Sequence, residues 1–459
     1  MKLKTNKTGK LCRSHAGTKD AKSLAVTSVQ ATDCALADFP SKKIRGTAAS
    51  CGHKNLLIIG LGSIALLLKF VIAFNTFGSS DAVVFYTFAK SLSRDGLEWT
   101  YRHSILFNHP PLTAHYLKLI FYLDQKASFQ ASGLTFPVLL RLPGILADFV
   151  VLLVLLEIRR NYPKIAIPTW SLALFALSPV SLMVSGYHGN TDPVMVMFLV
   201  LAAYMCLGNK PVLSGLSLAL SCQIKIVPLL LVPIFFFFWF ERNRSRLFVS
   251  SFALALLLLW SEALLKFPGV FTKNVLSYGG FWGLWGITYW LRLTGLPQFH
   301  VVNFFHLPLS ETIVMTSLKL VIVATVLIIA WRRRKLCGEA ISGSLAYAWI
   351  IFFVFTPSAS AQYLVWFAPF VLMLSPVFYA WLTATSSLFV FFFYNDTAHQ
   401  FPWYFSMSTD KLNTVWTPWA LWPWATLIVG LVLIWKKAEA LDPSLRLFSF
   451  QTLRAEARH

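Results

Sequence analysis

The stretch NLLIIGLGSIALLLKFVIAF, residues 55–74, decides the fold class of this chain. It carries one charged residue, Lys69. The hydrocarbon core of a bilayer is about 30 Å thick and is crossed by about 20 mainly apolar residues of α-helix. Similar runs recur almost to the C-terminus, and the chain is 56% hydrophobic and only 13% charged. This composition is too apolar for a soluble protein and predicts an all-α polytopic membrane protein.

Working outward from residues 55–74, we expect about twelve transmembrane helices. The other spans are predicted at 137–156, 165–184, 193–207, a pair within 211–240, 247–265, 312–330, 340–355, 363–374, 377–393 and 419–435. The stretch 211–240 is too short for two full crossings at about 1.5 Å per residue and too long for one. Two short, tilted helices that meet near residues 223–227 would fit it.

The basic residues mark one side of the membrane. The net charge is +21, and its Lys and Arg residues cluster in 157–164, 241–246, 331–335 and 436–437. Such clusters are typical of cytoplasmic loops, so topology explains the charge and we expect no nucleic-acid partner. The turns 185–192 and 356–362 contain no Lys or Arg and are predicted outside. Both termini are therefore expected in the cytoplasm, in a bacterial plasma membrane or the endoplasmic reticulum.

The predicted organisation has three parts. Residues 1–54 are expected to be a disordered basic cytoplasmic tail, with a transit peptide as the weaker alternative. Residues 55–437 form the membrane domain, with large outer loops at 75–136, 266–311 and 394–418, and residues 438–459 form a second cytoplasmic tail. Two amphipathic stretches of the first loop, 82–92 and 113–123, suit helices along the membrane surface. We expect no structural disulfide, because none of the six cysteines pairs obviously in an outer loop.

Several polar residues lie at the predicted outer boundary. Asp81 ends the segment GSSD, residues 78–81, directly before an amphipathic stretch, so it is either a helix N-cap or a general base. His109 lies in NHPPL, residues 108–112, as the wall of a site or part of an ordinary turn. Arg141 is placed to hold a phosphate at the outer end of its span. Asp148 lies deeper, and we favour an intramembrane basic or hydroxyl partner for it.

Three further motifs complete the candidate site. The turn YHGNTDP, residues 187–193, offers His188 and Asp192, and Asp192 is again a possible N-cap. Lys225 in QIKIVP, residues 223–228, would bind a lipid phosphate or form a structural ion pair. Gln362 and Tyr363 in 356–366 could hydrogen-bond a donor headgroup. The second large loop has Gly alternating with Trp at 278–286, suited to a sugar or to the membrane interface, followed by Arg292.

Together these motifs resemble the GT-C superfamily of membrane glycosyltransferases, and most of all its mannosyltransferase-like branch. The resemblance runs in order from about residue 55 to residue 435, although each motif is short. The matching residues are Asp81, Asn108 to Leu112, Arg141-Leu142-Pro143, Leu146-Ala147-Asp148, Asp192, Lys225 with Pro228, Gln362-Tyr363-Leu364, Trp366 and Pro369.

The resemblance implies an inverting glycosyltransferase with a polyprenyl-phosphate sugar donor, dolichyl or undecaprenyl. It would transfer a hexose, with mannose favoured, to a lipid, glycan or protein acceptor on the extracytoplasmic or lumenal face. Asp81 would be the general base, and Lys225 and Arg141 would contact the phosphate. The chain has Asp81-Ala82-Val83 where some relatives carry an Asp-x-Asp pair, so no metal site or cofactor is predicted, although a divalent metal stays possible.

Two other functions remain open. A lipid-linked sugar flippase or other transporter would need polar residues along helix interiors, whereas the ionisable groups here concentrate at one boundary, apart from Asp148 and Glu262. The absence of a clear internal repeat also disfavours repeat-built transporters. A polysaccharide polymerase or ligase would use outer-loop residues such as Arg292 and His300. The sequence favours the transferase.

Overall fold

The computed structural model describes residues 48–441 except 105, 278–279, 300–306 and 408–417. The two predicted tails, 1–54 and 438–459, lie almost wholly outside these residues. Cys206, Cys222 and Cys337 are free. Helices dominate the described chain, and the only described strands are β1 (Gly78–Ser79) and β2 (Phe405–Ser406), which pair in parallel. The predicted all-α class is confirmed.

The helices follow the apolar runs of the sequence. In chain order they are α1 (Ala48–Asn75), α2 (Ser80–Arg94), α3 (Leu97–His103), α4 (Pro111–Asp124), α5 (Ala127–Ala131), α6 (Phe136–Asn161), α7 (Thr169–Ala176), α8 (Pro179–Ser181), the π-helix η1 (Leu182–His188), α9 (Asp192–Leu207), α10 (Pro211–Ile224), η2 (Val227–Leu231), α11 (Val232–Phe240), α12 (Ser245–Lys266), α13 (Pro268–Phe271), η3 (Thr272–Leu276), α14 (Gly286–Leu293), α15 (Leu309–Arg332), α16 (Ala340–Phe355), η4 (Ala361–Val365), α17 (Ala368–Leu374), α18 (Pro376–Thr397), η6 (Pro418–Ala420) and α20 (Leu421–Leu441).

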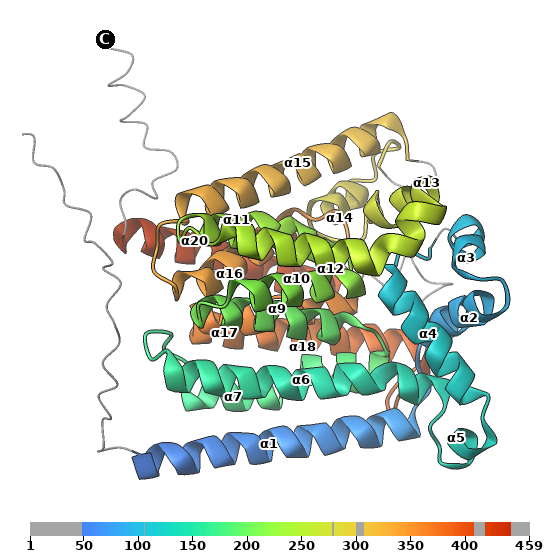
Figure 1. Ribbon diagram of the computed structural model, residues 1–459. Helices are drawn as coiled ribbons and strands as arrows, with labels where there is room; N and C mark the ends of the chain where they lie inside the picture. Colours follow the sequence, from blue (N-terminus) through green and yellow to red (C-terminus); the bar gives the residue numbers. More distant parts are fainter. Residues whose placement is uncertain (1–47, 105, 278–279, 300–306, 408–417, 442–459) are drawn as a thin grey trace, which may run out of the picture. The chain divides into compact units, whose positions relative to one another are not determined.

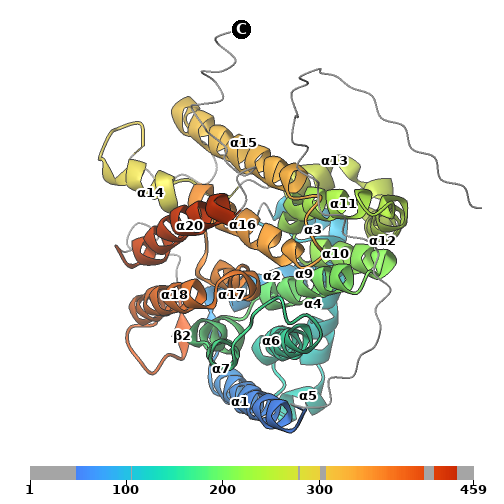
Figure 2. The same cartoon turned by 90° about the vertical axis from the view of Figure 1, so that its left-hand side faces the viewer.

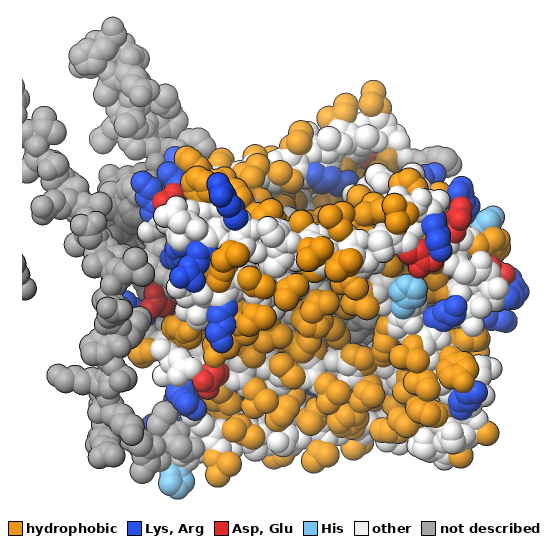
Figure 3. Space-filling view, viewed as in Figure 1, with side chains coloured by type: hydrophobic (Ala, Val, Ile, Leu, Met, Phe, Trp, Pro, Cys, Tyr) orange, Lys and Arg blue, Asp and Glu red, His pale blue; other side chains and the backbone are white. Residues whose placement is uncertain are grey.

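Six of the described helical segments are long and apolar enough to cross a membrane. They are His53–Asn75, Phe136–Asn161, Thr169–His188, Ser245–Lys266, Leu309–Arg332 and Pro376–Thr397. The other apolar helices have 10–17 residues, so the predicted count of about twelve spans is not confirmed. The long helices run side by side (Figure 1), and the end-on view places α6 next to α1 and α7 (Figure 2). Apolar side chains cover the band between two ends where charged residues gather (Figure 3), as expected of a membrane protein.

The basic segments meet at one end of this bundle. Arg334 Nε donates to Glu241 Oε1 at 2.7 Å, and Lys164 Nζ lies 3.9 Å from Glu339 Oε1. These two ion pairs join the segment 157–164 and the segment 241–246 to the connection after α15. Arg141 and Asn161 lie near opposite ends of α6, about 30 Å apart at 1.5 Å per residue. The loop bound by Arg141 is therefore far from the basic segments.

The helix is interrupted between α10 and α11, as predicted for residues 223–227. Lys225 has an extended backbone, with φ −143° and ψ 149°. Pro228 causes the break, because proline has no N–H for the carbonyl of residue 224 and its ring clashes with that carbonyl in a helix. The hydroxyl of Thr113 donates to the freed Ile224 carbonyl instead, at 3.3 Å. The break leaves the Lys225 side chain at a helix end.

The first large loop is a packed unit. Its two predicted helices are α2 and α4, which gather with α3 and α5 at one end of the long helices (Figure 1). Phe85 and Phe88 of α2 and Leu117 of α4 are buried in one apolar core with Trp260 of α12. Burial of such side chains contributes about 1.5–3 kcal/mol each. This core fixes α2, and α2 in turn positions Asp81.

Candidate functional site

The carboxylate of Asp81 is not used for helix capping. Ser79 is the N-cap of α2: its backbone is extended, with φ −92° and ψ 170°, and its hydroxyl accepts a hydrogen bond from the Asp81 N–H at 3.2 Å. The alternative that Asp81 is the N-cap is therefore wrong, because Ser79, two residues earlier, already occupies the capping position. Asp81 lies in the first turn, where the helix dipole favours a negative charge.

Arg141 holds the turn that leads to Asp81. All five of its N–H groups are used: it donates to the carbonyls of Pro137 at 3.0 Å, Gly186 at 3.1 Å, Thr76 at 2.8 Å and Phe77 at 2.6 Å, and to the Thr76 hydroxyl at 3.0 Å. The side chain is 1% exposed. In this structure Arg141 binds backbone, and the phosphate contact predicted for it would have to replace one of these bonds.

The same turn admits only glycine at position 78. Gly78 has φ +100°, and a Cβ atom there would lie 2.5 Å from the Tyr187 carbonyl oxygen. The N–H groups of Phe77 and Gly78 both donate to the Tyr404 carbonyl, at 2.9 and 3.1 Å. The Ser79 hydroxyl donates to the His188 carbonyl at 2.8 Å. The loop before Asp81 is thus fixed by the third outer loop on one side and by η1 on the other.

One oxygen of the Asp81 carboxylate, Oδ2, lies among three polar groups. It is 3.0 Å from His188 Nε2, 2.8 Å from Asn190 Nδ2 and 3.4 Å from Gln362 Nε2. Desolvation alone would raise the pKa of Asp81, but His188, the hydrogen bond from Asn190 and the charge of Lys225 together bring that pKa below its ordinary value of 3.8. The side chain is 33% exposed. Asp81 is therefore an ionised and accessible carboxylate.

The π-helix η1 brings His188 to this carboxylate. A π-helical turn is wider than an α-helical one and often marks a functional site. Gly186 allows η1 to pack against the backbone of Lys69 in α1, where a Cβ would lie 3.3 Å from its Cα atom. Gly189 then reverses the chain with φ +83°. His188 also lies 2.7 Å, through Nδ1, from the hydroxyl of Tyr394 in α18.

A second acidic group lies behind the first. Asp192 is fully buried, and its Oδ1 is 2.9 Å from Lys225 Nζ and 2.5 Å from Trp366 Nε1. Thr191 occupies the N-cap of α9, so the capping role considered for Asp192 is wrong and its carboxylate is used for the ion pair. Lys225 Nζ also lies over the ring of Tyr363, 4.6 Å from its centroid. The structural ion pair considered for Lys225 is present, and the phosphate contact stays a prediction.

His109 is a neutral, buried member of the same region. Its ring packs against Phe85 with centroids 5.0 Å apart, and its carbonyl accepts from the Tyr101 hydroxyl at 2.6 Å. Burial, helped by the charge of Lys225, lowers the pKa of His109 to about 3. Its Nδ1 is buried without a hydrogen-bond partner. This agrees with its predicted place in the wall of the site.

The structure brings most of the predicted residues together. The Asp81 cluster, as we name it below, consists of Asp81, His109, His188, Asn190, Asp192, Lys225, Gln362, Tyr363, Trp366 and Tyr394. Arg292 has its own environment in α14, where its guanidinium lies 5.1 Å from the Tyr289 ring centroid. His300 lies outside the described residues. In the part of the chain that the structure describes, no group of three or more His, Cys, Asp or Glu could hold a metal ion.

The sequence did not single out Asn190 or Tyr394. Asn190 lies between His188 and Asp192 in a turn that was already suspected, so its amide could have been proposed as a donor. Tyr394 carries no comparable signal, because it lies 206 residues from His188 in the chain.

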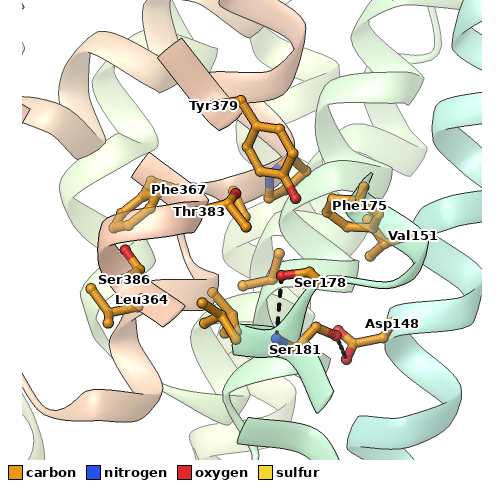
Figure 4. Close-up of a pocket in the computed structure, with 15 residues that line it drawn as sticks. Asp148, Val151, Phe175, Ser178, Ser181, Leu364, Phe367, Tyr379, Thr383 and Ser386 are labelled. Atoms are coloured by element: carbon orange, nitrogen blue, oxygen red, sulfur yellow. Dashed lines mark hydrogen bonds between the residues drawn. The ribbon is translucent and has the colours of Figure 1, made fainter. Parts of the chain in front are cut away.

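Asp148 forms a separate cluster inside the bundle. Its Oδ2 accepts from Lys69 Nζ at 2.5 Å, from the Ser181 hydroxyl at 2.6 Å and from the Ser185 hydroxyl. The expected basic and hydroxyl partners are confirmed. Asp148 and Ser181 border a small cavity of about 20 Å³, across from Tyr379 and other residues of α18 (Figure 4). This volume holds about one water molecule.

No protein-family model matches the sequence, and no curated protein matches it. The Asp81 cluster is accordingly interpreted from its own chemistry.

Proposed function

We propose that this chain is an inverting membrane glycosyltransferase of the GT-C type. It would move a hexose, with mannose favoured, from a polyprenyl-phosphate sugar to a lipid, glycan or protein acceptor. The observation that carries the proposal is Asp81: an ionised, one-third exposed carboxylate held by hydrogen bonds, close enough to Lys225 for the lysine to lower its pKa. In a glycosyl transfer such a carboxylate can deprotonate the acceptor hydroxyl, and a nearby cation can hold the leaving phosphate.

In the proposed reaction, the acceptor oxygen forms a bond to the anomeric carbon while the bond from that carbon to the phosphate oxygen breaks. Asp81 takes the proton of the acceptor hydroxyl as general base. The electron pair of the broken bond leaves with polyprenyl phosphate, and the charge of Lys225 would stabilise that leaving group. Attack from the face opposite the phosphate inverts the configuration of the sugar.

The proposed topology has about twelve spans, made of the six long helices and of shorter apolar helices. Charge patterning would place both termini and the basic segments in the cytoplasm, in a bacterial plasma membrane or the endoplasmic reticulum. Asp81 would then act on the extracytoplasmic or lumenal face. Polyprenyl-phosphate sugars suit this side, because their lipid chain stays in the bilayer while the sugar reaches the water interface.

One observation bears on the flippase alternative, namely the small cavity beside Asp148. A flippase must pass a sugar through the bundle, but the cavity of about 20 Å³ holds about one water molecule and is too small for a sugar. A polymerase or ligase that used Arg292 would need its guanidinium free, whereas it lies against Tyr289. The transferase therefore remains the better proposal.

The proposal is tested with purified protein in nanodiscs and a panel of radiolabelled polyprenyl-phosphate sugars, by following the release of polyprenyl phosphate. Asp81→Asn should lower turnover by about 100-fold or more, since general bases contribute about 10²–10⁴. The matched control is Asp95→Asn at the other end of α2, where Asp95 pairs with Arg94 at 2.9 Å and should leave turnover unchanged.

Wild-type kcat/KM should fall on the acid side, where Asp81 takes up a proton, because a protonated carboxyl cannot act as the general base. Normal turnover by Asp81→Asn would remove Asp81 from the mechanism. A lack of turnover with every donor, together with movement of lipid-linked sugar in liposomes, would favour the flippase.

A further inference from the structure

The hydrogen bond between Tyr394 and His188 determines which imidazole nitrogen carries the proton. Both side chains are buried, and Tyr394 Oη lies 2.7 Å from His188 Nδ1. A buried phenol O–H must donate to an acceptor, because an unmade bond costs about 1–3 kcal/mol. Among the described residues, His188 Nδ1 is the acceptor within hydrogen-bond distance of the Tyr394 hydroxyl. The neighbouring phenol, Tyr187, lies 2.7 Å from the Ser406 hydroxyl instead.

An imidazole nitrogen that accepts a hydrogen bond carries no proton. When Nδ1 accepts from Tyr394, the single proton of a neutral His188 is on Nε2. Nε2 lies 3.0 Å from Asp81 Oδ2 and can then donate to it. The three groups form one chain of hydrogen bonds, from the phenol through the imidazole to the carboxylate.

We infer that Tyr394 is a positioning residue that holds His188 neutral with its proton on Nε2, so that Asp81 keeps the basicity that transfer requires. Its catalytic consequence rests on the proposed function, whereas the protonation of His188 does not. A doubly protonated imidazolium would place a full positive charge against Asp81 and weaken its affinity for a proton. A neutral His188 orients the carboxylate through its hydrogen bond without that charge.

The other charged groups around His188 do not decide its state by themselves. Asp81 from α2 and Asp192 from α9 both favour a positive imidazolium. Lys225 opposes it as the partner of Asp192, at 2.9 Å, and so does Arg141 of α6, which packs against Gly189 next to His188. Two nearby anions are thus opposed by two nearby cations. We therefore base the protonation state of His188 on its hydrogen bond with Tyr394.

Aromatic contacts, one of them from Trp403 in the predicted third outer loop, fix the position of Tyr394. Its ring packs against the rings of Tyr187 and Trp403, with centroid distances of 5.0 and 5.5 Å. β2 of the same loop pairs with β1, directly before Asp81. Residues 403–406 therefore contact Tyr394 and the turn that precedes Asp81, which fits a role in orienting the hydrogen-bond chain.

The test is ¹⁵N nuclear magnetic resonance of the full chain in nanodiscs with ¹⁵N-labelled histidine. The His188 signals are assigned by their loss in His188→Gln. Wild type should show a neutral His188 with its proton on Nε2 at pH 7. Tyr394→Phe removes the donor and should shift His188 toward imidazolium or the Nδ1–H form. Tyr187→Phe is the matched control and should leave the His188 signals unchanged.

The kinetic readout is the acid limb of kcat/KM. In Tyr394→Phe, a His188 that carries protons on both nitrogens makes Asp81 a weaker base, so kcat/KM on the acid side should fall relative to wild type. Tyr187→Phe should not move it. A wild-type His188 with its proton on Nδ1, or on both nitrogens, would overturn the inference even if Tyr394→Phe does not fold. The expected spectra with no transfer activity would uphold the inference and reject the proposed function.

Discussion

Asp81 and Asp148 each accept hydrogen bonds from several side chains, yet their surroundings differ. Asp148 has a lysine and two serine hydroxyls on a single oxygen, and its side chain is 14% exposed. Asp81 has His188 and two amides on one oxygen, and it is 33% exposed. The closest cation is bound directly to Asp148, whereas Lys225 is bound to Asp192 and affects Asp81 only through space.

The difference separates a structural carboxylate from a reactive one. A lysine in direct contact balances the charge of Asp148. Asp81 is ionised without a bound cation, so it can still take a proton from a ligand. The sequence placed Asp81 at the predicted outer boundary and Asp148 deeper in a span, but it did not identify the partner residues of either carboxylate. The arrangement of their partners in space tells them apart.

The largest expected effect comes from breaking the Asp148 pair. Lys69→Met leaves a buried carboxylate without its cation and should lower the free energy of unfolding by about 3–5 kcal/mol. The measurement is thermal or denaturant unfolding in nanodiscs. Asp81→Asn should change stability by less than about 1 kcal/mol, because an asparagine oxygen can accept the same hydrogen bonds.

Two variants serve as controls for this comparison. Lys266→Met removes a pair with Glu262 at 3.5 Å in which the lysine is 68% exposed, and such exposed pairs contribute about 0–1 kcal/mol. Lys69→Met combined with Asp148→Asn removes both charges and should recover most of the lost stability. If Lys69→Met is as stable as Lys266→Met, Asp148 is not the structural carboxylate that the comparison requires.

The helical class followed from the sequence, because a long apolar run of this kind needs a helix in lipid. The number of spans did not, since several apolar helices have only 10–17 residues. The break at residues 223–227 was also predictable, since a proline cannot continue the hydrogen-bond pattern of a helix. The packing of α2 and α4 could not be predicted from the sequence. An amphipathic pattern shows that one face of a helix is buried, but it does not show which element covers that face. Here the covering residues include Trp260 of α12.

The candidate site was predictable in its residue types and less so in their roles. Asp81 and His188 were suspected because they are polar residues at the predicted outer boundary, and Lys225 because a charge among apolar residues is costly. The sequence could not show which residues they contact. Either Ser79 or Asp81 could cap α2, and Arg141 could bind either a phosphate or backbone carbonyls. Only the spatial positions of segments distant in the chain decide such competitions, as the contact between Tyr394 and His188 shows.

The next largest effect concerns the geometry that keeps Asp81 accessible. Gly78→Ala combines backbone strain at φ +100° with a clash against the Tyr187 carbonyl. We expect a loss of about 2–3 kcal/mol of stability and at least a tenfold lower turnover per folded molecule. The measurement pairs unfolding with the donor assay.

Gly96→Ala is the matched control for this variant. Gly96 has φ +87°, but a Cβ atom at this position would have no neighbouring atom within 4 Å. The alanine therefore adds strain without a clash and should keep its turnover. Equal turnover losses at the two positions would show that general strain, rather than displacement of the loop before Asp81, causes the effect.

The smallest effect concerns Lys225, which the comparison separates from Lys69. Lys225→Gln alone would leave the buried Asp192 carboxylate without its cation, so it is combined with Asp192→Asn to remove both charges. If Lys225 also binds the donor phosphate, the double variant should raise the donor KM about tenfold, equivalent to about 1.4 kcal/mol, with a smaller change in kcat. Asp192→Asn alone keeps the lysine and should not raise the KM. An unchanged KM in the double variant would make Lys225 a structural counterion like Lys69.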